Sequence, residues 1–170
     1  MQGIDEVKVE AWLNTHIDGV EGPYSYSLIA GGRSNLTFLV ADAHGTQMVL
    51  RRPPLGHVLA TAHDMAREHR IISAVGQTDV PVPATLGLCT DESVNGAPFY
   101  VMAFVDGLVI RDRETSERLL LPDARRRASE SIVDTMAAIH AVNPISVGLD
   151  DLGRHEGYIA RQLKRWYGQW

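Results

Sequence analysis

Residues 24–52 read YSYSLIAGGRSNLTFLVADAHGTQMVLRR, a run of apolar stretches interrupted by two turn-like segments. The stretches at 24–30, 36–42 and 46–52 contain the β-branched and aromatic residues that favour strands. Glycine-containing turns join them, so the segment predicts three strands connected by hairpins. The first turn, AGGRSN at residues 30–35, fits an ordinary hairpin and also fits a loop whose backbone N–H groups cover a phosphate.

Helices are predicted on both sides of these strands. Residues 5–17 have apolar side chains at near-helical spacing, and Gly19 follows as a stop signal. Residues 61–75 predict a second helix, with Thr61 and Asp64 in capping-box spacing.

The later part of the chain adds two strands and then becomes helical. The strands are expected within residues 79–90 and at 97–105, which read APFYVMAFV. Leu121-Pro122-Asp123 is typical of a helix start, and a last helix is expected at 155–170. One apolar face of that last helix consists of Ile159, Leu163, Trp166 and Trp170.

A change in composition near residues 107–121 divides the chain. Residues 1–106 mix helices and strands, residues 107–121 are expected to form a linker, and residues 122–170 are predicted to be helical. The apolar face of the last helix runs to Trp170 with no glycine cap or polar tail. We therefore expect this helix to belong to a larger domain, and its apolar surface to offer a route to oligomers.

Charge and cysteine content limit the class of protein. The 170 residues carry a formal net charge of −5 with one polybasic run, Arg125-Arg126-Arg127, which argues against duplex nucleic acid as a partner. No apolar run approaches the ~20 residues of a membrane span, and the N-terminus does not resemble a signal peptide. The single cysteine, Cys89, lies in an apolar stretch and is expected to be a buried, unreactive thiol. These features predict a cytoplasmic protein that is not inserted in a membrane.

The predicted helix at 61–75 carries a carboxylate, Glu68, on its apolar face. The other residues of that face are Met65, Ile72 and Val75. A buried carboxylate requires a cation or hydrogen-bond donors, because its desolvation alone costs several kcal/mol. One interpretation is that Glu68 lies at the edge of the face and reaches water. The other is that it pairs with Arg51, which strand alternation places on the same side as Val49.

Seven segments occur in an order that resembles a known family. They are GGRSNLTFLV, VLRRPP, AHDMAREHR, VPVP, FYVMAFVDG, AAIHAVNP and GYIARQLKRW. Together they resemble the aminoglycoside phosphotransferase and choline-kinase-like family of small-molecule kinases, in particular the branch associated with acyl-CoA dehydrogenases. The resemblance covers nearly the whole chain from about residue 28. It implies an α+β protein-kinase-like N-terminal lobe, with a five-stranded antiparallel sheet and a C-type helix, followed by the first helices of an α-helical C-terminal lobe.

In this family a glycine-rich loop folds over the phosphates of ATP. The resemblance assigns that role to backbone N–H groups at residues 32–35, with the Ser34 hydroxyl as an additional donor. The residues concerned are Gly32, Arg33, Ser34 and Asn35. The third-strand cation corresponds to Arg51, which is expected to contact the α- and β-phosphates while Glu68 holds it. Arginine replaces the lysine that is usual in protein kinases, and its planar fork also suits a pair of phosphate oxygens.

The segment FYVMAFV corresponds to the fifth strand of the lobe and the hinge that follows it. The resemblance places Met102 at the back of an adenine pocket, with the Ala103 carbonyl and the Val105 N–H on the edge of adenine. These are backbone contacts, so the alanine at 103, where an acidic residue is more usual, does not oppose the assignment. Read alone, the segment predicts a buried central strand, which it would also be in a kinase-like lobe.

The catalytic residues of the family have no counterpart in the sequence. Its members need a His-Gly-Asp motif, an asparagine five residues further on and an acidic residue on the next strand, the last two binding Mg²⁺. No catalytic or metal-binding residue is therefore assigned, and the 170 residues are expected to bind nucleotide weakly and not to catalyse. Asp151-Leu152-Gly153 imitates a kinase metal motif but precedes the last helix, so it is interpreted as a loop. His63-Asp64 and His140 are interpreted as helix-start and helix-end residues.

The sequence thus predicts the N-terminal, nucleotide-binding portion of an ATP- and Mg²⁺-dependent phosphotransferase that acts on a hydroxyl of a small molecule. The acceptor is expected to be of aminoglycoside or hydroxyacyl-CoA type. Two alternatives remain: a non-catalytic nucleotide-binding or protein-interaction module, and a generic α+β domain in which Arg51 and Glu68 form a structural ion pair. A basic face on the last helix is interpreted as solvated, although it could also meet a CoA phosphate; it consists of Arg161, Lys164 and Arg165.

Overall fold

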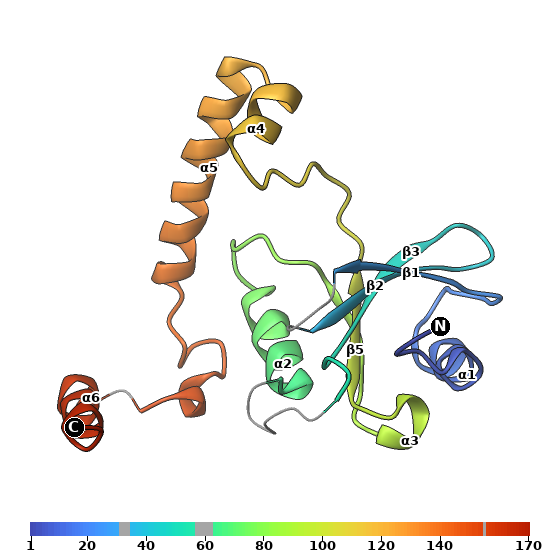
Figure 1. Ribbon diagram of the computed structural model, residues 1–170, viewed down its shortest axis with the longest axis horizontal. Coiled ribbons are helices and arrows are strands. Elements are labelled where there is room, and N and C mark those ends of the chain that lie inside the picture. Colours follow the sequence, from blue (N-terminus) through green and yellow to red (C-terminus); the bar gives the residue numbers. More distant parts are fainter. Residues whose placement is uncertain (31–34, 57–62, 155) are drawn as a thin grey trace.

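The strands form one five-stranded antiparallel sheet (Figure 1). The computed structural model describes residues 1–30, 35–56, 63–154 and 156–170. The spatial order of the strands is β1-β2-β3-β5-β4, and every neighbouring pair is antiparallel. The expected α+β class and antiparallel sheet are therefore confirmed. The strands are β1 (Ser25–Ala30), β2 (Leu36–Ala41), β3 (Gln47–Arg52), β4 (Thr85–Cys89) and β5 (Phe99–Ala103).

One face of the sheet packs against the N-terminal helix α1 (Glu6–His16) and forms the hydrophobic core. From β2 and β3 this face presents Phe38 and Leu50, which lie opposite each other and are almost completely buried. The Trp12 ring of α1 contacts the Phe99 ring of β5 edge to face, at a centroid distance of 4.9 Å. Burial of each such side chain contributes roughly 1.5–3 kcal/mol, so this layer carries much of the stability of the fold.

The opposite face of the sheet presents a more polar set of side chains. Thr37, Arg51 and Tyr100 lie directly opposite one another on β2, β3 and β5, so their side chains project from the same face. Helix α2 (Met65–Val75) lies against this side of the sheet, next to β4 and β5 (Figure 1). The two faces of the sheet therefore have different partners, α1 on one and α2 on the other.

Helix α2 begins later than the sequence indicated. The expectation of a helix that starts at Thr61 is wrong, because the helix begins at Met65 and the preceding Asp64 is extended. The Asp64 side chain accepts a hydrogen bond from the Arg67 N–H at 2.9 Å. An acidic N-cap satisfies a free N–H group of the first turn by itself, so the helix needs no cap further upstream. Thr61 itself lies outside the described residues.

The buried guanidinium of Arg52 connects the N-terminal segment to the sheet through hydrogen bonds. The Arg52 guanidinium donates to the Gly3 carbonyl at 2.7 Å and to the Asn95 carbonyl at 3.0 Å. Asn95 ends the short helix α3 (Glu92–Asn95), and Gly96 follows with a φ of +70°. The chain therefore turns at Asn95-Gly96, after one helical turn.

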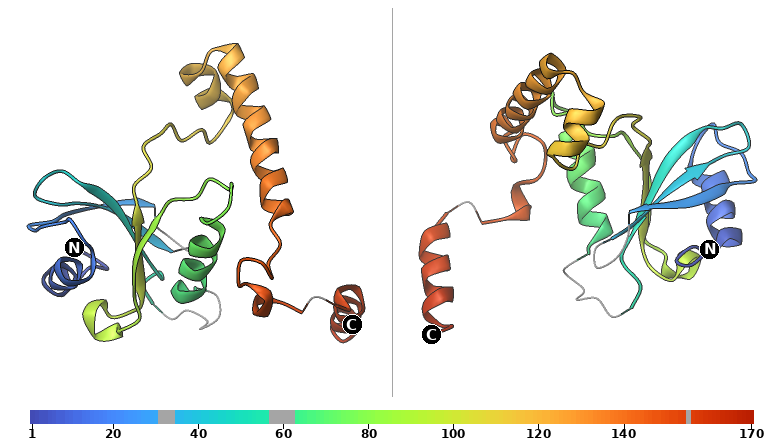
Figure 2. Two further views of the ribbon diagram at one scale, coloured as in Figure 1. Left: turned by 180° about the vertical axis from the view of Figure 1, so that it is seen from behind. Right: turned by 45° about the horizontal axis from the view of Figure 1, so that its top comes forward.

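The remaining elements are helical: α4 (Arg113–Leu119), α5 (Pro122–Ala141), a 3-10 turn at Asp150–Leu152, and α6 (Tyr158–Tyr167). Helix α5 starts at the predicted Pro122, whereas α4 lies inside the segment expected to be a linker. Helix α6 stands apart from the sheet (Figure 2), and its apolar residues are exposed. Within the described residues, no helix has both the length and the apolar character needed to cross a membrane.

Candidate functional site

Arg51 and Glu68 form an ion pair between the sheet and α2. The Arg51 Nε lies 3.0 Å from the Glu68 Oε2, and the side chains are 31% and 30% exposed. Strand alternation directs Arg51 toward α2, and Glu68 stands in the first turn of that helix, where a negative charge is favoured. The predicted pairing is therefore present, and both side chains also remain partly exposed to water.

Two further groups donate to the Glu68 carboxylate. The Asn35 Nδ2 donates to Oε1 at 2.7 Å, and the Tyr100 hydroxyl donates to Oε2 at 3.4 Å. Burial and the nearby charge of Glu68 raise the pKa of Tyr100 to about 12, so this phenol remains a donor at neutral pH. The carboxylate thus has a donor at each oxygen, which compensates for its partial removal from water.

Arg51 keeps part of its guanidinium open to another partner. The Nε is taken by Glu68, and Nη1 donates to the Thr37 Oγ1 at 3.3 Å. Nη2 makes no hydrogen bond to the residues that the structure describes. A cation held on one side by a carboxylate and open on the other can bind an anion such as a phosphate.

An apolar cavity of about 670 Å³ lies on the same face of the sheet. Thr37 joins the two features, because it lines the cavity and its hydroxyl accepts a hydrogen bond from Arg51. A cavity of this size and character beside a cation suits a ligand with an apolar ring and an anionic group. The lining residues are Ile29, Thr37, Val49, Pro81, Val82, Pro83, Met102, Ala103, Phe104, Val105, Gly107 and Val109.

The predicted hinge residues surround this cavity. Met102, Ala103 and Val105 all line it. The Ala103 N–H donates to the Ala84 carbonyl at 2.8 Å, whereas the Val105 N–H has no acceptor in the described part of the chain. Strand β5 ends at Ala103, two residues before the end of the predicted strand at 97–105, because the chain leaves the sheet here to border the cavity. The contacts of these residues with adenine stay a prediction.

Of the predicted phosphate loop at residues 32–35, the structure describes only Asn35. Gly32, Arg33 and Ser34 lie outside the described residues, and their role stays a prediction. Asn35 is buried, and its side chain is hydrogen-bonded to Glu68 and to His63.

Two members of the site, Thr37 and Tyr100, were missed from the sequence. Both lie directly opposite Arg51 in neighbouring strands. For Thr37 a signal existed, because the register of the hairpin that joins 36–42 to 46–52 places it across from Arg51. Tyr100 belongs to a strand that is not consecutive with β3, and the sequence carries no local signal for that pairing.

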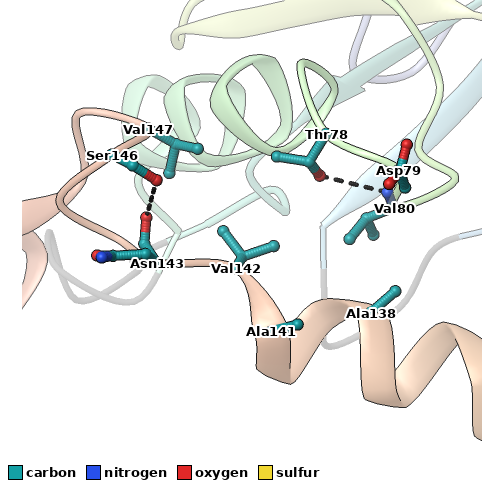
Figure 3. Close-up of a pocket in the computed structure, with 9 residues that line it drawn as sticks. All are labelled: Thr78, Asp79, Val80, Ala138, Ala141, Val142, Asn143, Ser146 and Val147. Carbon is teal, nitrogen blue, oxygen red and sulfur yellow. Dashed lines mark hydrogen bonds between the residues drawn. The ribbon is translucent and has the colours of Figure 1, made fainter.

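A second cavity, of about 300 Å³, lies where the segment after α2 meets the end of α5 (Figure 3). Thr78 and Val80 line one side of it, and Val142 and Ser146 line the other. The Val80 N–H donates to the Thr78 Oγ1 at 3.2 Å, and the Ser146 hydroxyl donates to the Asn143 carbonyl at 2.9 Å. These polar groups are satisfied within the protein, so we interpret this cavity as a junction between segments rather than a ligand site.

An ion pair lies near this junction. Arg70 of α2 contacts both carboxylate oxygens of Asp151, at 2.8 Å and 2.6 Å, and also donates to the Gly148 carbonyl. The hydrogen bonds from Arg70 lower the pKa of Asp151. Asp151 therefore helps to attach α2 to the segment that follows α5.

Comparisons with known proteins relate the chain to one family. The model of the family described as "Phosphotransferase enzyme family" matches residues 25–170. Acyl-CoA dehydrogenase family member 10 of Mus musculus is 34% identical over 165 residues, which are 97% of this chain and 15% of that protein. Acyl-CoA dehydrogenase family member 11 of Homo sapiens is 33% identical over 170 residues, which are 98% of this chain and 21% of that protein. The chain thus spans about a fifth or less of the length of these relatives.

A solved structure shows the same arrangement of elements. It comes from Ralstonia eutropha JMP134 and is assigned as an aminoglycoside phosphotransferase. Its sequence is 36% identical, its TM-score to this chain is 0.77, and the match covers 97% of this chain and 46% of that chain.

Proposed function

The chain belongs to the phosphotransferase enzyme family, and from that premise we propose that it is the nucleotide-binding portion of an ATP-dependent kinase for a small molecule. The kinase would transfer the γ-phosphate of ATP to a hydroxyl of its acceptor. One observation carries the proposal: Arg51, held by Glu68, keeps an N–H group open beside an apolar cavity. A nucleotide has an apolar base and an anionic tail, which match these two features.

In this proposal adenine occupies the cavity and the phosphates reach Arg51. Met102 would lie behind the adenine, while the Ala103 carbonyl and the Val105 N–H would bind its edge. Backbone N–H groups of residues 32–35 would cover the phosphates. Phosphoryl transfer depends mainly on positioning and on neutralising charge, so Arg51 would act by holding the phosphates in place.

The described residues do not fit a metal site. Among them, no group of three or more His, Cys, Asp or Glu side chains is arranged to hold a metal ion. We therefore propose that Mg²⁺ and the base that activates the acceptor hydroxyl are held by parts of a longer protein. The relatives extend well beyond the matched region. The 170 residues alone would then not catalyse phosphoryl transfer. Acceptor-dependent ATP consumption by these residues would contradict this proposal.

The acceptor class is proposed from the relatives. Those named as acyl-CoA dehydrogenase family members favour a hydroxyacyl-CoA acceptor, whereas the structural neighbour favours an aminoglycoside-type acceptor. The two classes differ in charge, because CoA carries phosphates and aminoglycosides carry several amines. ATP consumption by a longer chain, measured with one acceptor of each class, would distinguish them.

Calorimetric titration with ATP tests the nucleotide site. We expect saturable binding by the unmodified chain and a loss of about tenfold or more in Arg51→Ala and Glu68→Ala, because hydrogen bonds to charged groups contribute about 1.5–3 kcal/mol. Arg113→Ala is the matched control, since Arg113 is an exposed cation paired with Glu117 on α4. Full affinity in Arg51→Ala would refute the assignment of this residue, and identical losses in the control would point to a nonspecific charge effect.

A protein-interaction module is the second candidate. It is favoured by the exposed apolar residues of α6, of which Trp166 is 57% exposed and Tyr167 is 78% exposed. Contiguous apolar surface of this kind often marks an interface. A chain that self-associates or binds a partner but shows no saturable ATP binding would support this alternative.

A further inference from the structure

Asn35 is a buried amide at the end of the glycine-rich turn, and both ends of its carboxamide are hydrogen-bonded. It is only 5% exposed. The Nδ2 donates to the Glu68 Oε1 at 2.7 Å, and the Oδ1 accepts from the His63 Nδ1. One side chain therefore connects the start of β2, the first turn of α2 and the residue before the cap of α2.

The orientation of this amide follows from its partners. A carboxylate oxygen only accepts, so the Asn35 group facing Glu68 must be the NH₂. The carbonyl of the amide then faces His63, whose Nδ1 must carry a proton in order to donate. Both the neutral Nδ1–H tautomer and the charged imidazolium satisfy this requirement. The two contacts together oppose a flip of the amide.

The contact with Asn35 determines how Glu68 can face Arg51. Oε2 receives the Arg51 Nε and the Tyr100 hydroxyl, whereas Oε1 receives only Asn35 among the described residues. A carboxylate with donors on both oxygens is fixed about its terminal torsion. Without Asn35, Oε1 would lose its donor in a partly buried place, and the carboxylate could rotate away from Arg51.

We propose that Asn35 is a positioning residue for the nucleotide phosphates. It acts through Glu68, which in turn holds the Arg51 guanidinium, whose Nη2 makes no hydrogen bond to the described residues. This inference rests on the proposed function, and it differs from the expectation that residue 35 serves the phosphates through its backbone N–H. Asn35 also links the residue position that precedes β2 to α2 through a side chain.

Two substitutions test the link. Asn35→Asp is nearly isosteric and replaces the donor with an acceptor, so two carboxylates face each other and we expect ATP affinity to fall by about tenfold or more. Asn35→Ala removes the donor without adding charge and is expected to lower ATP affinity in the same direction. Asn143→Asp is the matched control, because Asn143 is exposed and its Oδ1 accepts from the Ile145 N–H, as a carboxylate also can. Calorimetric titration of each chain with ATP gives the affinities, and a melting curve of each unliganded chain reports on folding.

A rescue experiment separates positioning from a purely structural role. In the double variant Asn35→Asp/Glu68→Gln, the amide at position 68 can donate to the carboxylate at position 35 and still accept from the Arg51 Nε. We expect the double variant to bind ATP about threefold or more tightly than Asn35→Asp alone. If Asn35 had only a structural role, the double variant would regain the melting temperature of the unmodified chain but would not regain its affinity for ATP.

The outcomes distinguish this inference from the proposed function. If the unmodified chain shows no saturable ATP binding, the proposed function fails. If the unmodified chain binds ATP and both Asn35 variants bind it equally well, only the inference is overturned. It is likewise overturned if the double variant binds ATP no better than Asn35→Asp.

Discussion

Burial and the charge of Glu68 act together on the pKa of Tyr100, a residue of the candidate site. It is 1% exposed, and its hydroxyl donates to Glu68. Its pKa is raised above the ordinary value of 10.0 to about 12, because burial and the Glu68 charge both disfavour the phenolate. At high pH the unfolded chain therefore loses this proton before the folded chain does.

The consequence is a defined alkaline loss of stability. The contribution of Tyr100 to folding is fully present below pH 10 and is lost as the pH rises toward 12, with a slope of at most about 1.4 kcal/mol per pH unit. Tyr100→Phe should make this loss shallower. Urea denaturation at a series of pH values between neutral and pH 11 measures the slope, and equal slopes in the two proteins would contradict the prediction.

Some residue contacts of the candidate site could be predicted from the sequence and others could not. Arg51 and Glu68 were paired correctly, because strand alternation and helix periodicity each determine the direction of one side chain. The contact between Asn35 and Glu68 has no such basis. It joins a turn to a helix 33 positions away, where no periodic pattern relates the two residues. Contacts of this kind depend on how elements pack, which local sequence does not encode.

At the scale of elements, α1 approaches β4 closely at Gly87. A Cβ at this position would lie 2.8 Å from the Ile17 Cδ1 and 2.9 Å from the Trp12 Cη2. We expect Gly87→Ala to destabilise the fold by about 1–3 kcal/mol, because the Trp12 ring is already packed against Phe99. Urea denaturation measures the change, and Gly153→Ala is the control, since a Cβ there meets no atom within 4 Å. Equal stability of the two variants would contradict the prediction.

The attachment of α2 gives a second prediction at this scale. Arg70 links α2 to Gly148 and Asp151, and both side chains of the ion pair are substantially exposed. An exposed pair adds little to global stability, so Arg70→Gln should act locally and should speed hydrogen exchange in α2 and in residues 148–152. Arg126→Gln, which breaks a pair within α5, is the control. Exchange rates that match the control in these segments would refute the link.

Elements were predicted from sequence to different degrees. All five strands were anticipated, because apolar, β-branched and aromatic residues form them and turn residues or prolines separate them. The start of α2 was placed too early, since Asp64 serves as the cap and not as the third position of a capping box. Helix α4 was missed because its seven residues show no apolar periodicity, although Asp112 caps it by accepting from the Thr115 N–H.

At the scale of the whole molecule, helices α5 and α6 expose many of their apolar side chains, whereas the sheet and α1 bury most of theirs. The exposed residues of α5 and α6 include Ile132, Met136, Ile159, Leu163 and Trp166. We expect the chain to self-associate as its concentration rises, and Leu163→Lys with Trp166→Lys to reduce this association. Sedimentation velocity over a range of concentrations measures it. Lys164→Glu, which changes charge outside the apolar face, is the control, and equal association of all the variants would refute the prediction.

The two faces of the sheet separate the residues that hold the fold from those that form the candidate site. On β3, Met48 and Leu50 belong to the hydrophobic core, whereas Val49 lines the cavity and Arg51 pairs with Glu68. Substitutions at neighbouring positions of β3 therefore act on different parts of the molecule. Variation at alternate positions of this strand can alter the lining of the cavity while the hydrophobic core is left untouched, which makes position 49 a natural first choice for a library that seeks a new ligand preference.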